Sequence, residues 1–124
     1  MSRYNDIVME HFSDPYHRGT MDAPDAVGVA HLRAGSGPFV QLFLRIDQQT
    51  VGEAMFQARG CGFTIAAMSV LTEMIEGQPT ERCRQITREA IDQELGGLPR
   101  EKAFCAGLAH LALHNALDQL GVPT

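Results

Sequence analysis

Hydrophobic and polar residues follow two different periods along this chain, which predicts a helix, three strands and then further helices. Near the amino terminus apolar side chains recur at helical spacing, and Asp14-Pro15 ends this pattern. The spacing predicts a short amphipathic helix with its polar side toward water, and the residues that set the spacing are Tyr4, Ile7, Val8, His11 and Phe12. A passage rich in Gly, Pro and Asp ends near Asp25, and "AVGVAHLRA" after it predicts a first strand.

Two further segments alternate with the period of a strand. In the first, apolar Val40, Leu42, Leu44 and Ile46 alternate with Gln41, Phe43, Arg45 and Asp47. In the second, "TVGEAMFQAR", the residues Ala54, Phe56 and Ala58 stand opposite Glu53, Gln57 and Arg59. Only Gln48-Gln49 separates the two runs, so we expect them to pair as a hairpin.

From Gly62 onward the period becomes helical, and Gly77 followed by Pro79 ends this helix. The polar pattern of residues 79–95 predicts one or two short helices, and we expect the last long helix to start near Pro99. Strands grouped ahead of helices predict an α+β fold, in which a three-stranded antiparallel sheet carries helices on one face. A chain of 124 residues without a linker or repeat predicts one domain, residues 1–124.

Composition narrows the possible functions. The net charge is −5, with 10 basic against 15 acidic residues and no basic cluster, which disfavours a nucleic-acid surface. The amino terminus lacks the apolar core of a signal peptide, and the apolar stretches are too short to span a membrane. We therefore expect a cytoplasmic protein without a membrane partner. Three widely spaced cysteines suit a reducing compartment, as free thiols or as ligands.

Cys61 stands between Gly60 and Gly62, where the strand pattern gives way to the helical one. A thiol at a helix start faces backbone N–H groups and the positive end of the helix dipole, which favour the thiolate form. Flanking glycines leave room for a bulky ligand, so "GCG" suits a metal, cluster or persulfide site. A small buried cysteine in a tight turn is the equally weighted alternative.

The other two cysteines give weaker signals. If the last helix begins at Pro99, Cys105 lies about a turn and a half into it, again near a helix start. Small residues follow it on the same side, namely Ala109, Ala112 and Ala116, which favours close packing as its role. Cys83 lies between Arg82 and Arg84, so we expect a partly exposed thiol, perturbed by these charges and without a function.

His110 and His114 have the i, i+4 spacing of a helical zinc site. Leu111 stands where the metalloprotease motif requires glutamate, so protease chemistry is disfavoured. Two ordinary helix histidines on a mostly solvated stripe are the favoured interpretation.

Three stretches together resemble the iron-sulfur cluster scaffold family of IscU and the amino-terminal domain of NifU. They are "YNDIVMEHFSDPYHRG", "ARGCGFTIAAMSVLTEMIEG" and "LPREKAFCAGLAHLALHNAL", and the resemblance covers most of the chain. It implies a three-stranded antiparallel sheet with helices on one face. It also implies a site at which three cysteines, with a nearby aspartate or histidine, hold a [2Fe-2S] cluster or zinc.

The resemblance carries over to this sequence residue by residue. Cys61 matches the family's middle cysteine, and Cys105 matches the last, which is also a sulfur acceptor. Ser36 stands at the position of the first cysteine, Pro38 at that of the aspartate, and Phe104 at that of the histidine. Serine is a much poorer ligand than a thiolate, because its hydroxyl must lose a proton of far higher pKa.

The resemblance implies a non-enzymatic scaffold or carrier that binds a [2Fe-2S] cluster, iron or zinc through Cys61 and Cys105, with Ser36 as a weak third candidate. A cysteine desulfurase would supply sulfur, acceptor proteins would receive the cluster, and a homodimer would bring four thiolates together. The alternative is a paralogue without metal that acts as an interaction protein of the assembly machinery. A thiol redox protein, with a reversible disulfide between Cys61 and Cys105, is the third hypothesis.

Overall fold

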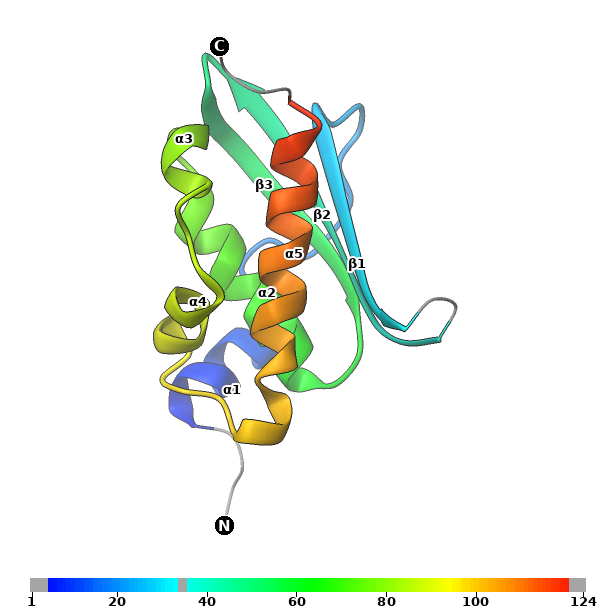
Figure 1. Ribbon diagram of the computed structural model, residues 1–124, viewed down its shortest axis with the longest axis vertical. Helices are drawn as coiled ribbons and strands as arrows, with labels where there is room; N and C mark the ends of the chain where they lie inside the picture. The colour runs from blue at the N-terminus through cyan, green and yellow to red at the C-terminus, as the bar shows by residue number, and fades with distance from the viewer. Residues whose placement is uncertain (1–4, 34–35, 121–124) are drawn as a thin grey trace.

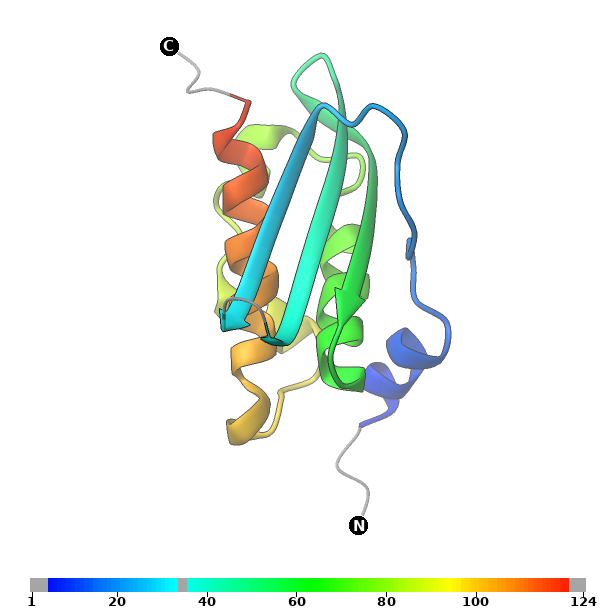
Figure 2. The ribbon, with the colours of Figure 1, turned by 90° about the vertical axis from the view of Figure 1, so that its right-hand side faces the viewer.

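The computed structural model describes residues 5–33 and 36–120 and confirms the predicted α+β architecture. The strands β1 (Ala26–Arg33), β2 (Ser36–Asp47) and β3 (Thr50–Arg59) form one antiparallel sheet in the order β1-β2-β3. The helices α2 (Gly62–Ile75) and α5 (Phe104–Asp118) lie together on one face of this sheet (Figures 1 and 2). The remaining elements are α1 (Asp6–Ser13), α3 (Thr80–Cys83), α4 (Arg88–Glu94) and the 3-10 helix η1 (Arg100–Lys102).

The core lies between the sheet and the two long helices. The alternation predicted for β2 is confirmed at Val40, Leu42 and Leu44, which are fully buried. Twelve of the fourteen residues of α2 are buried, because it lies between the sheet on one side and α1 and α5 on the others. Phe43, on the opposite face of the sheet, is only 8% exposed, although its place in the alternation predicted an outward polar position.

Side chains and loop segments cover both edges of the sheet. At β3, the N–H of Phe56 donates to the carbonyl of His17, and the N–H of Gly19 donates to the carbonyl of Phe56. At β1, the amide of Gln119 accepts from the N–H of Val27 and donates to its carbonyl. Because exposed edges invite pairing with other chains, these contacts restrict strand addition on both sides.

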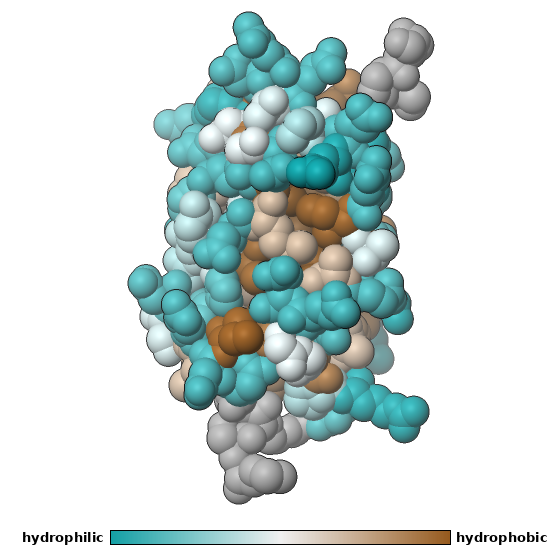
Figure 3. Space-filling view, turned by 90° about the vertical axis from the view of Figure 1, so that its left-hand side faces the viewer, coloured by the Kyte–Doolittle hydropathy of each residue, from teal (hydrophilic) through white to brown (hydrophobic). Residues whose placement is uncertain are grey.

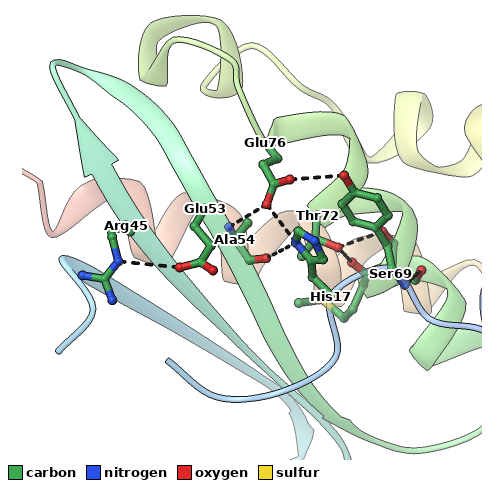
Figure 4. A network of polar contacts seen from close by, with 9 residues as sticks. His17, Arg45, Glu53, Ala54, Ser69, Thr72 and Glu76 are labelled. Atoms are coloured by element: carbon green, nitrogen blue, oxygen red, sulfur yellow. Dashed lines mark hydrogen bonds and ion pairs between the residues drawn. The ribbon is translucent and has the colours of Figure 1, made fainter. Parts of the chain in front are cut away.

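A polar network ties the segment after α1 to α2 and β3 (Figure 4). Glu76, at the end of α2, lies 2.8 Å from Nδ1 of His17 and accepts from the Tyr16 hydroxyl at 3.1 Å. The hydroxyl of Ser69 accepts from the N–H of Tyr16 at 2.7 Å and lies 2.8 Å from Nδ1 of His11. The network therefore holds α1 and the following segment against the outer side of α2.

The prediction for α1 is only partly confirmed. Asn5 caps the helix by accepting from the N–H of Val8, and its amide donates to the carbonyl of Leu95. Within α1 only Val8 is buried, whereas Ile7 and Phe12 remain 42% and 40% exposed. Tyr4 lies outside the described residues. Most of the predicted apolar side of this helix therefore remains at the surface.

The close approach of α5 to β1 depends on a glycine. A Cβ atom at Gly28 would lie 1.9 Å from the carbonyl oxygen of Ala112 and 2.7 Å from the backbone nitrogen of Ala116. Backbone atoms of a packed helix cannot yield as a flexible side chain does. Gly28 therefore sets the separation between α5 and the sheet.

We expect Gly28→Ala to lower the free energy of unfolding by about 3 kcal/mol or more, because α5 must shift away from β1. Gly52→Ala is the matched control in β3, where the nearest atom to an added Cβ lies 3.7 Å away, an ordinary contact. Urea unfolding followed by circular dichroism measures both variants. Equal stability of the two would contradict this account of the contact between α5 and β1.

Candidate thiol site

Cys61 occupies the corner between β3 and α2. It is the N-cap residue of α2, and its carbonyl accepts from the N–H groups of Thr64 and Ile65. Gly60 precedes it with φ +154°, and a Cβ there would lie 2.8 Å from the hydroxyl oxygen of Thr64. The predicted room beside Gly60 is therefore taken by Thr64, and glycine is needed here for close packing.

The Cys61 thiol is half-buried and has its pKa lowered from the ordinary value. Burial by itself raises the pKa, but other contacts outweigh it. These are hydrogen bonds from the backbone N–H and hydroxyl of Thr64 and from the N–H of Phe63, together with the charge of Lys102. Cys61 is thus the thiolate-prone cysteine that its place at a helix start predicted.

Cys105 lies in the first turn of α5, one residue after Phe104. The expected start near Pro99 is wrong by several residues, because the chain first makes η1 and only then enters the α-helix. Cys105 is fully buried, as is each of the small residues predicted to share its side, Ala109, Ala112 and Ala116. Burial, with Cys61 as a smaller cause, raises the pKa of the Cys105 thiol to about 11.

Thr64 joins the two cysteines and was not found from the sequence. Its buried hydroxyl oxygen lies 3.8 Å from Sγ of Cys61 and 3.4 Å from Sγ of Cys105. Thr64 is the third residue of α2, and a side chain at that position can reach back toward the N-cap. The spacing Cys-x-x-Thr at a helix start is therefore the signal that could have indicated it.

One hydroxyl proton can be donated to only one of the two sulfur atoms. Because Cys61 is the more readily ionised, Thr64 is suited to donate to Cys61 and to accept from the neutral thiol of Cys105. The pair is thereby arranged as one half-buried thiol with a lowered pKa beside one fully buried thiol with a raised pKa.

Lys102 is a second residue that the sequence did not indicate as part of the site. It lies in η1, and its Nζ is 5.9 Å from the centre of the Phe63 ring. Its positive charge lowers the pKa of both Cys61 and Cys105. The 3-10 turn before α5 therefore brings a cation to the two thiols.

The starts of β2, α2 and α5, which carry Ser36, Cys61 and Cys105 or lie next to them in sequence, are found toward the same end of the molecule, the lower end in Figures 1 and 2. Ser36 is the first residue of β2, where its backbone is paired with Arg33, and its side chain lies outside the described part. Pro38 and Phe104 are both half-buried. Among the described residues, no group of three or more His, Cys, Asp or Glu side chains is arranged to hold a metal ion.

Two expectations are corrected. Cys83 is fully buried rather than partly exposed, because the short helix α3 turns it inward, and burial raises its pKa to about 11. The histidines of α5 are half-buried rather than mostly solvated, with ring centres 4.3 Å apart.

Arg84 forms a hydrogen bond with the carbonyl of Leu117 at 2.8 Å, which ties the segment after α3 to α5. The three cysteines are free, so the structure contains no disulfide among its described residues.

No helix in residues 5–33 and 36–120 combines the length and apolar character that crossing a membrane requires.

The family model for the NifU-like N-terminal domain matches residues 3–121. The iron-sulfur cluster assembly scaffold protein IscU 1 of Archaeoglobus fulgidus is 34% identical over 114 residues, which cover 92% of this chain and 74% of that protein. IscU of Aquifex aeolicus is 32% identical, with 92% and 73% covered. The nitrogen fixation protein NifU of Azospirillum brasilense is 39% identical over 94% of this chain, which spans only 39% of that longer protein.

Solved structures show the same fold. A NifU-like protein (N-terminal) from Brucella abortus superposes with a TM-score of 0.74 at 19% identity, covering 95% of this chain and 94% of that one. A second structure, from Fervidobacterium islandicum, has a TM-score of 0.72 at 16% identity, with 92% and 96% covered. From the matched model and the identities with IscU and NifU, the chain belongs to the NifU-like N-terminal domain family.

Proposed function

We propose that this protein is a scaffold or carrier in iron-sulfur cluster assembly, and that Cys61 and Cys105 hold the cargo. The observation that carries the proposal is the convergence of both thiols on the hydroxyl of Thr64, at 3.8 and 3.4 Å. Relatives named as cluster assembly scaffolds support it. The cargo is an iron-sulfur cluster or iron, with zinc as another ion that thiolates bind.

The two thiols differ in readiness for cargo. Cys61 is half-buried with a lowered pKa, whereas Cys105 is fully buried and neutral. Metals bind thiolates, so Cys61 is suited to make the first bond, and Cys105 joins after losing a proton and gaining access. The resemblance makes Cys105 the acceptor of persulfide sulfur, while the exposure of Cys61 favours it for first contact with a cysteine desulfurase.

One chain supplies only two thiolates to cargo that favours four protein ligands. A twofold dimer that meets at this end of the molecule would supply Cys61 and Cys105 twice. Ser36 is the first residue of β2 and is the other candidate ligand within the chain; the start of β2 lies at the same end of the molecule (Figure 2). The acceptor protein would then take the cluster by exchange of its own ligands for these thiolates.

A second candidate function is an interaction protein of the assembly machinery that binds no metal. The absence of a three-residue ligand group among the described residues favours it. Pro38 and Phe104, neither of which offers a ligand atom in its side chain, stand at two positions of the family site. Cargo loading separates the two functions.

The thiols should react in the order of their accessibility and pKa. With iodoacetamide at pH 8, Cys61 should be alkylated first, because a thiol with a pKa of about 11 is ionised in about one molecule in a thousand at that pH. Mass spectrometry of the folded protein identifies the modified residue. Faster modification of Cys83 or Cys105 would contradict the assignment.

Thr64→Val should slow the alkylation of Cys61 severalfold near neutral pH and move its pH–rate profile to higher pH. The change removes the hydroxyl hydrogen bond, which lowers the pKa of Cys61, so less thiolate is present at a given pH. Thr64→Ser keeps a hydroxyl and should retain most of the wild-type rate. Superimposable profiles for the wild type and Thr64→Val would show that the hydroxyl does not act on Cys61.

Cargo loading tests the proposed function directly. Under anaerobic conditions with ferrous iron, cysteine and a cysteine desulfurase, we expect the wild type to gain iron and a thiolate-to-iron absorption band. Cys61→Ala and Cys105→Ala should each lose most of both signals, since each removes half of the available thiolates. Cys83→Ala is the matched control and should load normally.

Iron content, visible absorption and molar mass by light scattering provide the measurements. A mass that doubles with loading would support the dimeric site. A folded wild type that gains neither iron nor absorption would overturn the scaffold function and leave the interaction protein.

A further inference from the structure

A cleft of about 440 Å³ opens beside α1, away from the thiol site. Its walls come from α1 and the residues that follow it, from α2 and from the end of α4: Ile7, Glu10, His11, Asp14, Pro15, Tyr16, Val70, Glu73 and Glu94. None of these residues is part of the thiol site. The hydroxyl of Ser69 accepts a hydrogen bond from the N–H of Tyr16 and forms another with His11, and these bonds hold the α1 wall against α2.

The charge of the cleft has one sign. Four of its lining residues carry carboxylates, namely Glu10, Asp14, Glu73 and Glu94. None of the lining residues in the described part of the chain is lysine or arginine. The exposed apolar surface of the same cleft comes from Ile7 and from the aromatic ring of Tyr16, since Val70 is buried. An apolar wall beside carboxylates suits a lysine or arginine side chain, whose methylene stem packs while its charged end is paired.

Exposed apolar side chains lie on α1 and in the segment after it, and two of them, Ile7 and Tyr16, line the cleft. Ile7, Met9, Phe12 and Tyr16 are each 40–42% exposed, all within ten residues of the chain. A helix that only had to pack on this fold would bury such residues, yet within α1 only Val8 is buried. The face that carries α3, α4 and α1 shows apolar surface set among hydrophilic side chains (Figure 3). Apolar surface around an interaction point is typical of a protein interface.

We propose that this cleft and the exposed side of α1 dock a basic amphipathic segment of a partner protein. A lysine or arginine of that segment enters the cleft between the carboxylates, and its apolar residues cover Ile7 and Tyr16. The chemistry of the surface favours this occupant over a second copy of this chain, whose net charge of −5 opposes an acidic cleft. The inference goes beyond the scaffold function and does not depend on cargo binding.

The test uses a fluorescein-labelled amphipathic peptide of leucine and lysine as the probe, measured by fluorescence anisotropy. We expect the double variant Glu73→Gln/Glu94→Gln to weaken binding about tenfold, because two carboxylates of the cleft lose their charge. The double variant Glu53→Gln/Glu81→Gln makes the same change in net charge on exposed residues outside the cleft. It should change the affinity by less than about twofold.

Two further probes separate charge from apolar contact. A peptide with glutamate in place of lysine should not bind, and one with serine in place of leucine should bind at least several times more weakly. Amide chemical shifts of the labelled protein should change around Tyr16, Val70 and Glu73 when the leucine–lysine peptide binds.

Equal weakening by the two double variants would show only a general charge effect and would overturn the proposal. Shift changes confined to another face would overturn it as well. Self-association that the cleft variant abolishes would assign the surface to a second copy of this chain, again against the proposal. Thermal unfolding of both double variants confirms that each remains folded.

Discussion

The contact between the backbone of α5 and Gly28 of β1 is the constraint on which the rest of this structure depends. An added Cβ there would meet the carbonyl of Ala112 at 1.9 Å, so the helix lies as close to the sheet as a backbone permits. Because α5 packs against α2 as well as against the sheet, this close approach holds α5 where its first turn brings Cys105 beside the first turn of α2. There Thr64 links Cys105 to Cys61.

Two helix starts meeting at one hydroxyl give the site its asymmetry. Cys61 receives backbone N–H groups and is half-buried, whereas Cys105 lies inside the contact between helices and remains neutral. Two thiolates on either side of the Thr64 hydroxyl would repel each other. Burial of Cys105 avoids this repulsion, because it favours the protonated thiol. The arrangement keeps one thiol that ionises readily and one that ionises only when a positive charge compensates it.

The thiol site and the contacts with the segment after α1 lie on different parts of α2. Its start carries the thiol site, and its outer side carries Ser69 and Glu76, which bind the segment after α1. Holding α1 there leaves Ile7 and Tyr16 exposed at the acidic cleft. A helix that is buried on nearly all sides can thus contribute to two surfaces, one at its start beside Cys61 and one where Glu73 reaches the cleft.

The sequence by itself determined the hairpin of β2 and β3, the helix from Gly62 and the place of Cys61 at a helix start, because each follows from the local period and turn residues. It misjudged Cys83, since Arg82 and Arg84 suggest solvent, while the single turn of α3 faces its last residue, Cys83, inward. The small residues beside Cys105 indicated its close packing, but Thr64 and Lys102 escaped prediction. Only the tertiary structure decided these, because they depend on how α5 and η1 approach α2, a contact between segments about forty residues apart that no local pattern encodes.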